Sequence, residues 1–313
     1  MAFGRMSRKG QASERTRFFS RKTPGDVVFD IVNVSLLVVL CITVLYPFWY
    51  MLMLSFSSPT DASTLGFHIW LKDWVPTAYR FAFSRYSSVD NAYINTIFRT
   101  IVGTFLTLIV VLLAAYPLSK KQLPGRNIMM TYILITMFFS GGLIPTYLLV
   151  RSLGLLNTRA SLIAQTLANG FYIIVARNFL MTIDPAYEES AFMDGASYFQ
   201  VFARIVLPLS KPLIATIALW TAVYHWNEWF LAMIYTRKEQ LIVLQLLLKR
   251  LIDLTSSTNP ALTQEFMDLE EVELPTEAVK SAVAMLTIGP IILFYPFIQR
   301  YFVKGVFVGS VKG

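Results

Sequence analysis

The chain has 313 residues, of which 55% are hydrophobic and 15% are charged. About a quarter of the residues in a soluble domain are charged, and a globular interior could not absorb this much apolar surface, so the composition favours a membrane protein. The net charge of +8 fits Lys and Arg held on the cytoplasmic side of a membrane, and we expect no nucleic-acid partner. The lone cysteine, Cys41, excludes an internal disulfide and a cysteine-based metal cluster, and we expect it to be a core residue.

The N-terminal segment is strongly basic. Residues 1–27 carry seven lysines and arginines before any apolar run begins. The run that follows is too long for a cleavable signal peptide, so it predicts a first membrane helix that stays in the protein. We expect residues 1–27 to form a cytoplasmic tail.

Six stretches are long and apolar enough to cross a bilayer, which takes about 20 helical residues. They are Ile31–Leu54, Ile97–Pro117, Ile128–Val150, Leu162–Ile183, Leu213–Tyr235 and Ala282–Val303. We therefore predict an all-α polytopic membrane protein with six transmembrane helices in residues 28–303. Glycine and proline predict kinks in the third and sixth helices, and the fourth is the weakest because Arg177 and Asn178 interrupt it.

The distribution of positive charge predicts the orientation. The basic tail and the short second connection, with Lys120, Lys121 and Arg126, fall on one side if there are six spans. Both termini, including residues 304–313, are therefore expected in the cytoplasm. On the opposite side, residues 236–281 form a long extracytoplasmic loop with several carboxylates. This loop is either a solvated, partly helical segment or a docking surface for an extracytoplasmic partner.

The cytoplasmic segment 184–212, between the fourth and fifth spans, predicts two short helices with a sharp bend. Asp184 is a good N-cap, and Pro185 suits the first helical position because its missing N–H costs nothing there. Gly195 is expected to stop the first helix, since glycine accepts the left-handed conformation of a helix C-terminus.

The second of these helices is expected to begin with a capping box of Ser197 and Gln200 and to end at Pro208. Helical spacing predicts one apolar face on it, made of Phe199, Phe202, Ala203 and Val206. A projecting helix–turn–helix of this kind suits the transmission of force to a partner.

The same segment resembles the cytoplasmic loop signature of binding-protein-dependent ABC importers. The family motif runs Glu-Ala-Ala, then Gly, then Ile-x-Leu-Pro, and Ser190 stands here in place of the first alanine. The resemblance implies an ATPase-coupling loop made of Glu189, Ser190, Ala191, Asp194, Gly195, Ile205, Leu207 and Pro208.

Two further stretches resemble the carbohydrate branch of these permeases. They are Trp226-Asn227-Glu228-Trp229 in the fifth span and the tail Lys304–Gly313. The resemblance implies an ABC type I importer permease fold in a bacterial cell membrane, surrounded by lipid. It also implies a second homologous permease in a heterodimer, two ATP-binding-cassette ATPase subunits and an extracytoplasmic solute-binding protein. The long loop and the basic tail suggest import of larger or polysaccharide-derived saccharides.

The sequence carries no Gly-x-x-x-x-Gly-Lys-Ser/Thr loop to hold phosphates, so the energy must come from another chain. We expect no catalysis and no bound cofactor in this chain, with ATP and Mg²⁺ used by the partner ATPase. A membrane-embedded enzyme is the first alternative, but the only histidines are His68 and His225 and there is no Asp-rich motif. A secondary carrier is the second alternative, and such carriers usually have more helices and coupling-ion sites.

The fifth span carries the candidates for a substrate pathway. Trp220, Tyr224 and Asn227 share one helical face, with Glu228 and His225 on a neighbouring face. Aromatic rings suit the C–H faces of a sugar, and amides and carboxylates suit its hydroxyls. The alternative is an interfacial aromatic belt with a helix-packing hydrogen bond from Asn227.

Other polar residues in the spans have structural as well as functional interpretations. Gln165, Asn169 and Tyr172 share a face of the fourth span, where they either line the pathway or make packing hydrogen bonds. Asp30 and Arg99 lie near predicted helix ends, where we expect them to snorkel to the interface.

Overall fold

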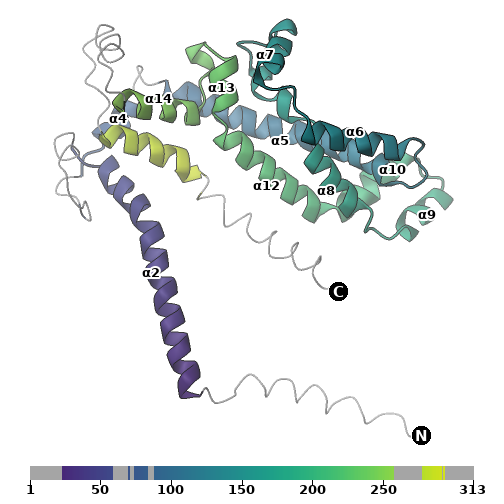
Figure 1. Ribbon diagram of the computed structural model, residues 1–313, viewed down its shortest axis with the longest axis horizontal. Helices are drawn as coiled ribbons and strands as arrows, with labels where there is room; N and C mark the ends of the chain where they lie inside the picture. The colour runs from purple at the N-terminus through teal and green to yellow at the C-terminus, as the bar shows by residue number, and fades with distance from the viewer. Residues whose placement is uncertain are drawn as a thin grey trace.

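A long helix, α5 (Val89–Ser119), runs through the centre of the structure, and the other helices are arranged along it (Figure 1). The structure is a computed structural model that describes residues 23–58, 70, 74–83, 88–256, 277–290 and 292. Every regular element within these ranges is a helix, which confirms the all-α prediction.

Two helices pack closely against α5, namely α8 (Gly170–Leu180) and α12 (Lys211–Asn227). Small residues on the buried face of α5, Gly103, Thr107 and Ala115, are spaced by multiples of four. This spacing lets helix backbones approach each other, which is how membrane helices associate without a hydrophobic driving force. α6 (Arg126–Phe138) lies beside α8 on the outside of this group (Figure 1).

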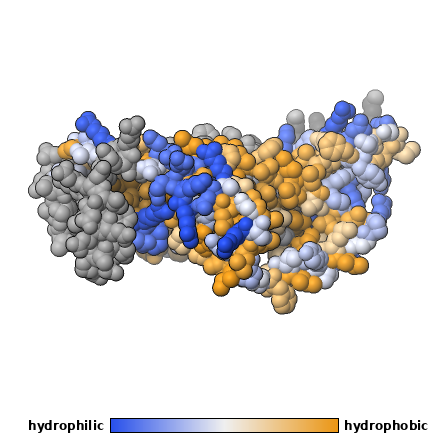
Figure 2. All heavy atoms as spheres, turned by 90° about the horizontal axis from the view of Figure 1, so that it is seen from above, coloured by the Kyte–Doolittle hydropathy of each residue, from blue (hydrophilic) through white to orange (hydrophobic). Residues whose placement is uncertain are grey.

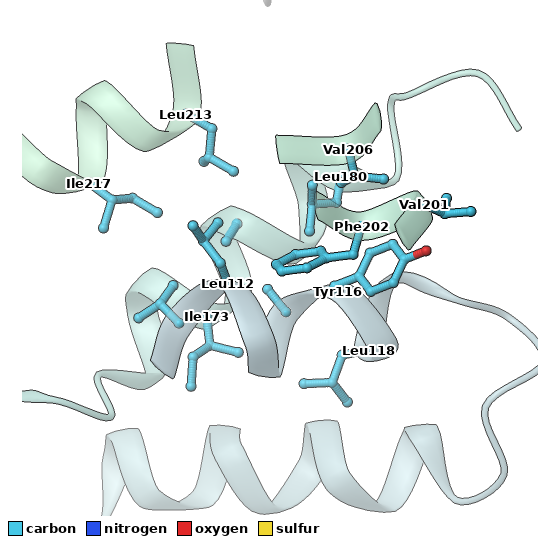
Figure 3. Close-up of a cluster of buried hydrophobic side chains, with 13 residues drawn as sticks. Leu112, Tyr116, Leu118, Ile173, Leu180, Val201, Phe202, Val206, Leu213 and Ile217 are labelled. Atoms are coloured by element: carbon cyan, nitrogen blue, oxygen red, sulfur yellow. The ribbon is translucent and has the colours of Figure 1, made fainter. Parts of the chain in front are cut away.

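The C-terminal half of α5 contributes to the first of three buried apolar clusters. Side chains from α5, α8, α12 and the helical segment before α12 meet there, as Figure 3 shows. The central members are Leu112, Tyr116, Ile173, Leu180, Phe202, Val206, Leu213 and Ile217. The cluster therefore joins the predicted cytoplasmic segment directly to two of the long helices.

The N-terminal half of α5 packs into a second cluster. It is shared with η2 (Arg159–Leu162), α13 (Phe230–Tyr235), α14 (Leu244–Ser256) and the helix of residues 277–290. Polar residues gather at the end of the molecule that holds α14, whereas apolar residues predominate over its middle (Figure 2).

The first helix, α2 (Pro24–Ser55), stands away from this body (Figure 1). Only its last residues, Met53, Leu54 and Ser55, are buried; Leu54 packs with α4 (Thr77–Ala82) and the helix of residues 277–290. The expectation of a core position for Cys41 is wrong, since this side chain is exposed. α2 is apolar on all sides, and the part of the chain that the structure describes buries only its last residues, so an apolar run there does not imply a core.

The predicted spans agree with the structure to different extents. α2 and α5 are long and apolar enough to cross a membrane, as expected for the first and second spans. The third is broken into α6 and α7 (Leu143–Ser152), which meet at 112°, at a glycine pair in which Gly142 has φ +86°. The kink predicted from glycine is thus confirmed, but it is a break rather than a bend.

The later spans are also interrupted. The fourth contains η2, η3 (Ala164–Thr166) and only eleven residues of α-helix in α8. The fifth is divided into α12 and α13 at Glu228. Most of the sixth, with Pro296, lies outside the described residues. Those residues hold two helices long enough to span, or up to four if each bent pair is one span, so six spans remain a prediction.

Candidate functional site

The segment predicted to couple to a partner forms two short helices at one end of the molecule (Figure 1). The first, α9 (Ala186–Met193), begins one residue later than predicted, with Pro185 at the N-cap position. Asp184 still helps to start it, because its Oδ1 accepts a 3.0 Å hydrogen bond from the N–H of Ala186. Gly195 follows the helix with φ +81°, which confirms the predicted left-handed C-terminus.

The second helix begins with the predicted capping box. The N–H of Ser197 donates to Gln200 Oε1 at 2.8 Å, and the N–H of Gln200 donates to Ser197 Oγ at 3.4 Å. Three pieces follow without a gap, namely α10 (Tyr198–Val201), the π-helical turn η4 (Phe202–Val206) and α11 (Leu207–Leu209).

The prediction that Pro208 ends this helix is wrong. The helix runs on to Leu209 and then bends by 79° into α12. Proline cannot donate the ordinary i to i−4 hydrogen bond, and the wider π turn comes directly before it. The local change of helix type therefore lets the chain continue through Pro208.

The buried face of the second helix agrees in part with the predicted one, and Ala203 is half-buried. Phe202 and Val206 are buried as expected, but Val201 joins them and Phe199 is 71% exposed. The ring of Phe202 packs on Tyr116 of α5, with 5.0 Å between the ring centroids (Figure 3). Sequence spacing gives the approximate face, but the partner helix determines which residues bury.

An ion pair fixes the first short helix to α5. The carboxylate of Glu188 accepts hydrogen bonds from the ammonium of Lys120, just past the end of α5, and lies 3.3 Å from the Tyr116 hydroxyl. The family motif had directed attention to Glu189, which is exposed. No local signal distinguishes these two adjacent carboxylates, so the pairing of Glu188 with Lys120 was not predictable from the sequence.

The outer surface of the two short helices exposes large apolar side chains. Tyr187, Met193, Tyr198 and Phe199 are all more than half exposed. We call these four residues the apolar tip. The motif residues Glu189, Ser190 and Asp194 are exposed on the same two helices or the turn between them, whereas Ala191, Ile205 and Leu207 pack against the first buried cluster.

The aromatic residues predicted for a pathway lie where α12 meets α8. Trp220 stacks on Tyr172, with 6.0 Å between centroids, and lies 5.9 Å from Phe171. Tyr224 is 42% exposed one turn further along α12. The rings of Phe171, Tyr172 and Trp220 are in mutual contact, and we call these three residues together with Tyr224 the aromatic shelf.

Two of the polar candidates near the shelf, Asn227 and Asn169, have partners within the chain. Asn227 Nδ2 donates to Val223 O, and its Oδ1 accepts from Gln245 of α14 at 3.2 Å. Asn169 caps α8 by accepting the N–H of Tyr172, and Gln165 is exposed. The packing role considered for these amides is therefore present for Asn227 and Asn169.

Glu228 belongs to a buried charged group. Its Oε2 lies 3.3 Å from Nη1 of Arg99, and both side chains are at most 9% exposed. The expectation that Arg99 snorkels to an interface is therefore wrong. α5 begins eight residues before the predicted span, so Arg99 lies well inside the helix and not near its end. Within the described residues, no three His, Cys, Asp or Glu side chains are grouped to hold a metal ion.

Comparisons with known proteins agree with this architecture. Residues 107–308 match the family model described as binding-protein-dependent transport system inner membrane component. Protein LplC of Bacillus subtilis (strain 168) is 38% identical over 294 residues, which cover 93% of this chain and 97% of that protein. The polygalacturonan/rhamnogalacturonan transport system permease protein YtcP of the same organism is 35% identical over 286 residues, covering 91% and 99%.

A solved structure extends the comparison to the fold. A chain of a bacterial ABC transporter involved in the import of the acidic polysaccharide alginate superimposes with a TM-score of 0.79 at 34% identity, covering 90% of this chain and 99% of that chain. The ABC importer permease fold is thus confirmed. The chain belongs to the family of inner-membrane components of binding-protein-dependent transport systems, in which it is a non-catalytic permease subunit of the carbohydrate ABC importers.

Proposed function

We propose that this chain and a second homologous permease together form the translocation pathway for an oligosaccharide delivered by an extracytoplasmic binding protein. Two ATPase subunits bind ATP and Mg²⁺ and drive transport, and the cytoplasmic segment 184–212 couples this chain to them. Both termini lie in the cytoplasm, and residues 236–281 face the binding protein. Membership of the family supports these partners.

The observation that carries this proposal is the construction of the coupling segment. The apolar tip presents uncovered apolar side chains at the end of the molecule, which suits a protein partner better than water. The ion pair of Glu188 with Lys120 and the packing of Phe202 on Tyr116 tie the same helices to α5. Movement of docked ATPase subunits would therefore pass to α5, and through the bend at Ser210 to α12.

The aromatic shelf is the proposed contact for the saccharide. Its rings come from α8 and α12, and Phe171 and Tyr224 expose more than two-fifths of their surface. Aromatic rings pack on the C–H faces of sugars, while nearby amides such as Asn227 can exchange hydrogen bonds with hydroxyls. Glu228 contributes indirectly, because its carboxylate is held by Arg99. The relatives named for polygalacturonan, rhamnogalacturonan and alginate suggest a substrate derived from a polysaccharide.

The test is uptake by the complete complex in proteoliposomes with a panel of labelled oligosaccharides. We expect uptake only with ATP, binding protein and both permeases present. Trp220→Ala and Tyr224→Ala should each reduce uptake at least tenfold without changing the yield of assembled complex. Val223→Ala is the matched control, because Val223 is 41% exposed on the same helix.

Three outcomes would contradict parts of the proposal. Uptake without ATP would indicate a secondary carrier. Full uptake by both aromatic variants would remove the shelf from the pathway. Loss of assembly in both variants would instead place the shelf in the interface with the second permease.

A further inference from the structure

Arg99 is a buried cation in the N-terminal half of the long helix α5. It lies about 15 Å along α5 from the first residue of that helix, from the rise of 1.5 Å per residue, and its side chain is 1% exposed. A guanidinium is permanently charged, so its burial in a membrane span is costly unless its donors are satisfied. The hydrogen-bond partners of Arg99 therefore indicate its role in the structure.

Those partners are the free ends of a broken helix. Arg99 Nε and Nη2 donate to the carbonyl oxygen of His225 at 2.8 and 2.6 Å, and Nη2 also donates to the carbonyl oxygen of Glu228 at 2.6 Å. The last carbonyls of a helix have no partner within that helix, and the helix dipole favours a cation beside them. Arg99 thus caps the C-terminus of α12 from a neighbouring helix.

The carboxylate of Glu228 connects the cap to the next helix. Its Oε1 accepts the N–H of Leu231, in the first turn of α13, at 2.6 Å, and its Oε2 faces Arg99. An anion is favourable at a helix N-terminus for the same reason that a cation is favourable at a C-terminus. The two side chains together therefore hold both ends of the break between α12 and α13.

Gly103 provides a second, independent contact at the same place. It lies one turn beyond Arg99 on α5, and a Cβ added there would be 2.3 Å from Nε2 of His225. The ring of His225 therefore rests against the backbone of α5 while its carbonyl accepts from Arg99. α5 therefore contacts both the ring and the main chain of His225.

The residues at the break each reach another element. Trp226 Nε1 donates to the carbonyl of Thr287 at 2.9 Å, Asn227 pairs with Gln245 of α14, and the ammonium of Lys249 lies 5.7 Å from the centre of the Trp229 ring. A shift of the break would move all of these contacts. It would also move Tyr224, which directly precedes the capped turn.

We propose that Arg99 is a positioning residue of the translocation pathway. By holding the break between α12 and α13 against α5, it sets the direction in which Tyr224 and Asn227 face a passing saccharide. This inference rests on the proposed function, but it concerns the geometry of the pathway and not the docking of the ATPase.

The test compares Arg99→Lys, Arg99→Met and Glu228→Gln in the complete complex. Lysine keeps the charge but lacks the planar fork that bonds two carbonyls at once. Because the apolar tip and the ion pair that fixes α9 to α5 remain, receptor-stimulated ATP hydrolysis should stay near the wild-type rate in Arg99→Lys. Saccharide transported per ATP hydrolysed should fall roughly tenfold or more, the effect of losing a charge-assisted hydrogen bond. Arg151→Lys, at an exposed arginine in the last turn of α7, is the matched control.

A structural readout accompanies transport. In a Cys41→Ala background, cysteines at positions 227 and 245 should be joined by a short bifunctional thiol reagent, because the native side chains are in contact. Arg99→Lys should slow this cross-linking, and Arg151→Lys should not. Glu228→Gln keeps the shape of the side chain, so it supplies a second variant if Arg99→Met does not insert.

The results separate this inference from the proposed function. An unchanged ratio of saccharide to ATP in Arg99→Lys would overturn the positioning role, and so would a loss confined to the amount of complex in the membrane. Failure of the wild-type complex to take up any saccharide would instead overturn the proposed function. Unchanged cross-linking in Arg99→Lys would show that the break does not depend on the guanidinium.

Discussion

Replacing Lys120 with methionine tests whether the coupling segment acts through α5. The ammonium of Lys120 pairs with Glu188 and lies 4.6 Å from the centre of the Tyr116 ring. The side chain of Glu188 is 10% exposed and that of Lys120 is 28% exposed. Methionine keeps most of the length of the side chain but removes the cation, so among the described residues the carboxylate of Glu188 keeps the Tyr116 hydroxyl, 3.3 Å away.

The expected cost is about 2 kcal/mol. Breaking a fully buried ion pair costs about 3–5 kcal/mol, whereas exposed pairs contribute about 0–1 kcal/mol. The partial exposure of Lys120 places this pair between those limits, and the loss of the cation–π contact adds roughly 0.5 kcal/mol. A change of about 2 kcal/mol shifts the balance between attached and detached α9 about 30-fold.

The assay is ATP hydrolysis by the reconstituted complex with and without loaded binding protein. We expect Lys120→Met to assemble and hydrolyse ATP but to lose most of the stimulation by the binding protein, because α9 no longer moves with α5. Lys121→Met is the matched control, since Lys121 is the exposed neighbour. Full stimulation in Lys120→Met, or an equal loss in Lys121→Met, would refute the reasoning.

Three further predictions concern backbone space and topology. Gly195→Ala should cost about 1–2 kcal/mol and weaken coupling, because φ is +81° while no atom lies within 4 Å of the added Cβ; equal thermal stability and uptake would rule out this strain. Gly103→Ala should lower the thermal unfolding temperature through overpacking of about 1–3 kcal/mol, and His225→Ala should partly restore it; no restoration would point to another clash. In a Cys41→Ala background, Lys121→Cys should resist impermeant thiol reagents in intact cells, and labelling from outside would reverse the predicted orientation.

Local signals in the sequence predicted local structure well. The capping box of Ser197 with Gln200 and the left-handed Gly195 both appear as expected. Each depends on residues within four positions, so the chain itself contains the information. The long apolar runs of α2 and α5 were predictable for the same reason, since length and composition decide them.

The path of the other spans was not predictable from composition. Hydropathy does not distinguish a straight helix from a broken one. The break at Gly142 was therefore predicted only as a kink, and the break at Glu228 was not predicted. A tertiary partner stabilises the break at Glu228, because the carbonyls freed in α12 bind Arg99, which lies 126 positions away from His225. A helical pattern that repeats about every four residues carries no information about a partner so far away in the sequence.

The sequence also did not show which of two adjacent residues makes a given contact. Glu188 and Glu189 differ by one position, or about 100° around a helix of 3.6 residues per turn. Only one of them points at the end of α5, and the motif that identified the segment favoured the other. A motif identifies the residues that a family shares. Which residue attaches α9 to α5 depends instead on the side chains that pack against it in the folded protein.

Two ion pairs, one buried and one partly buried, explain why α5 is central to the proposed mechanism. Lys120 follows the C-terminus of α5 and holds α9, whereas Arg99 lies towards the other end and holds the break after α12. They are 21 positions apart in the sequence, which corresponds to about 31 Å along a helix. Along that length α5 is packed against both α8 and α12, so a displacement at the coupling segment reaches the break through one rigid element. In the proposed function, Lys120 transmits the movement of the ATPase from α9 to α5. Arg99 then orients Tyr224 and Asn227, which contact the saccharide.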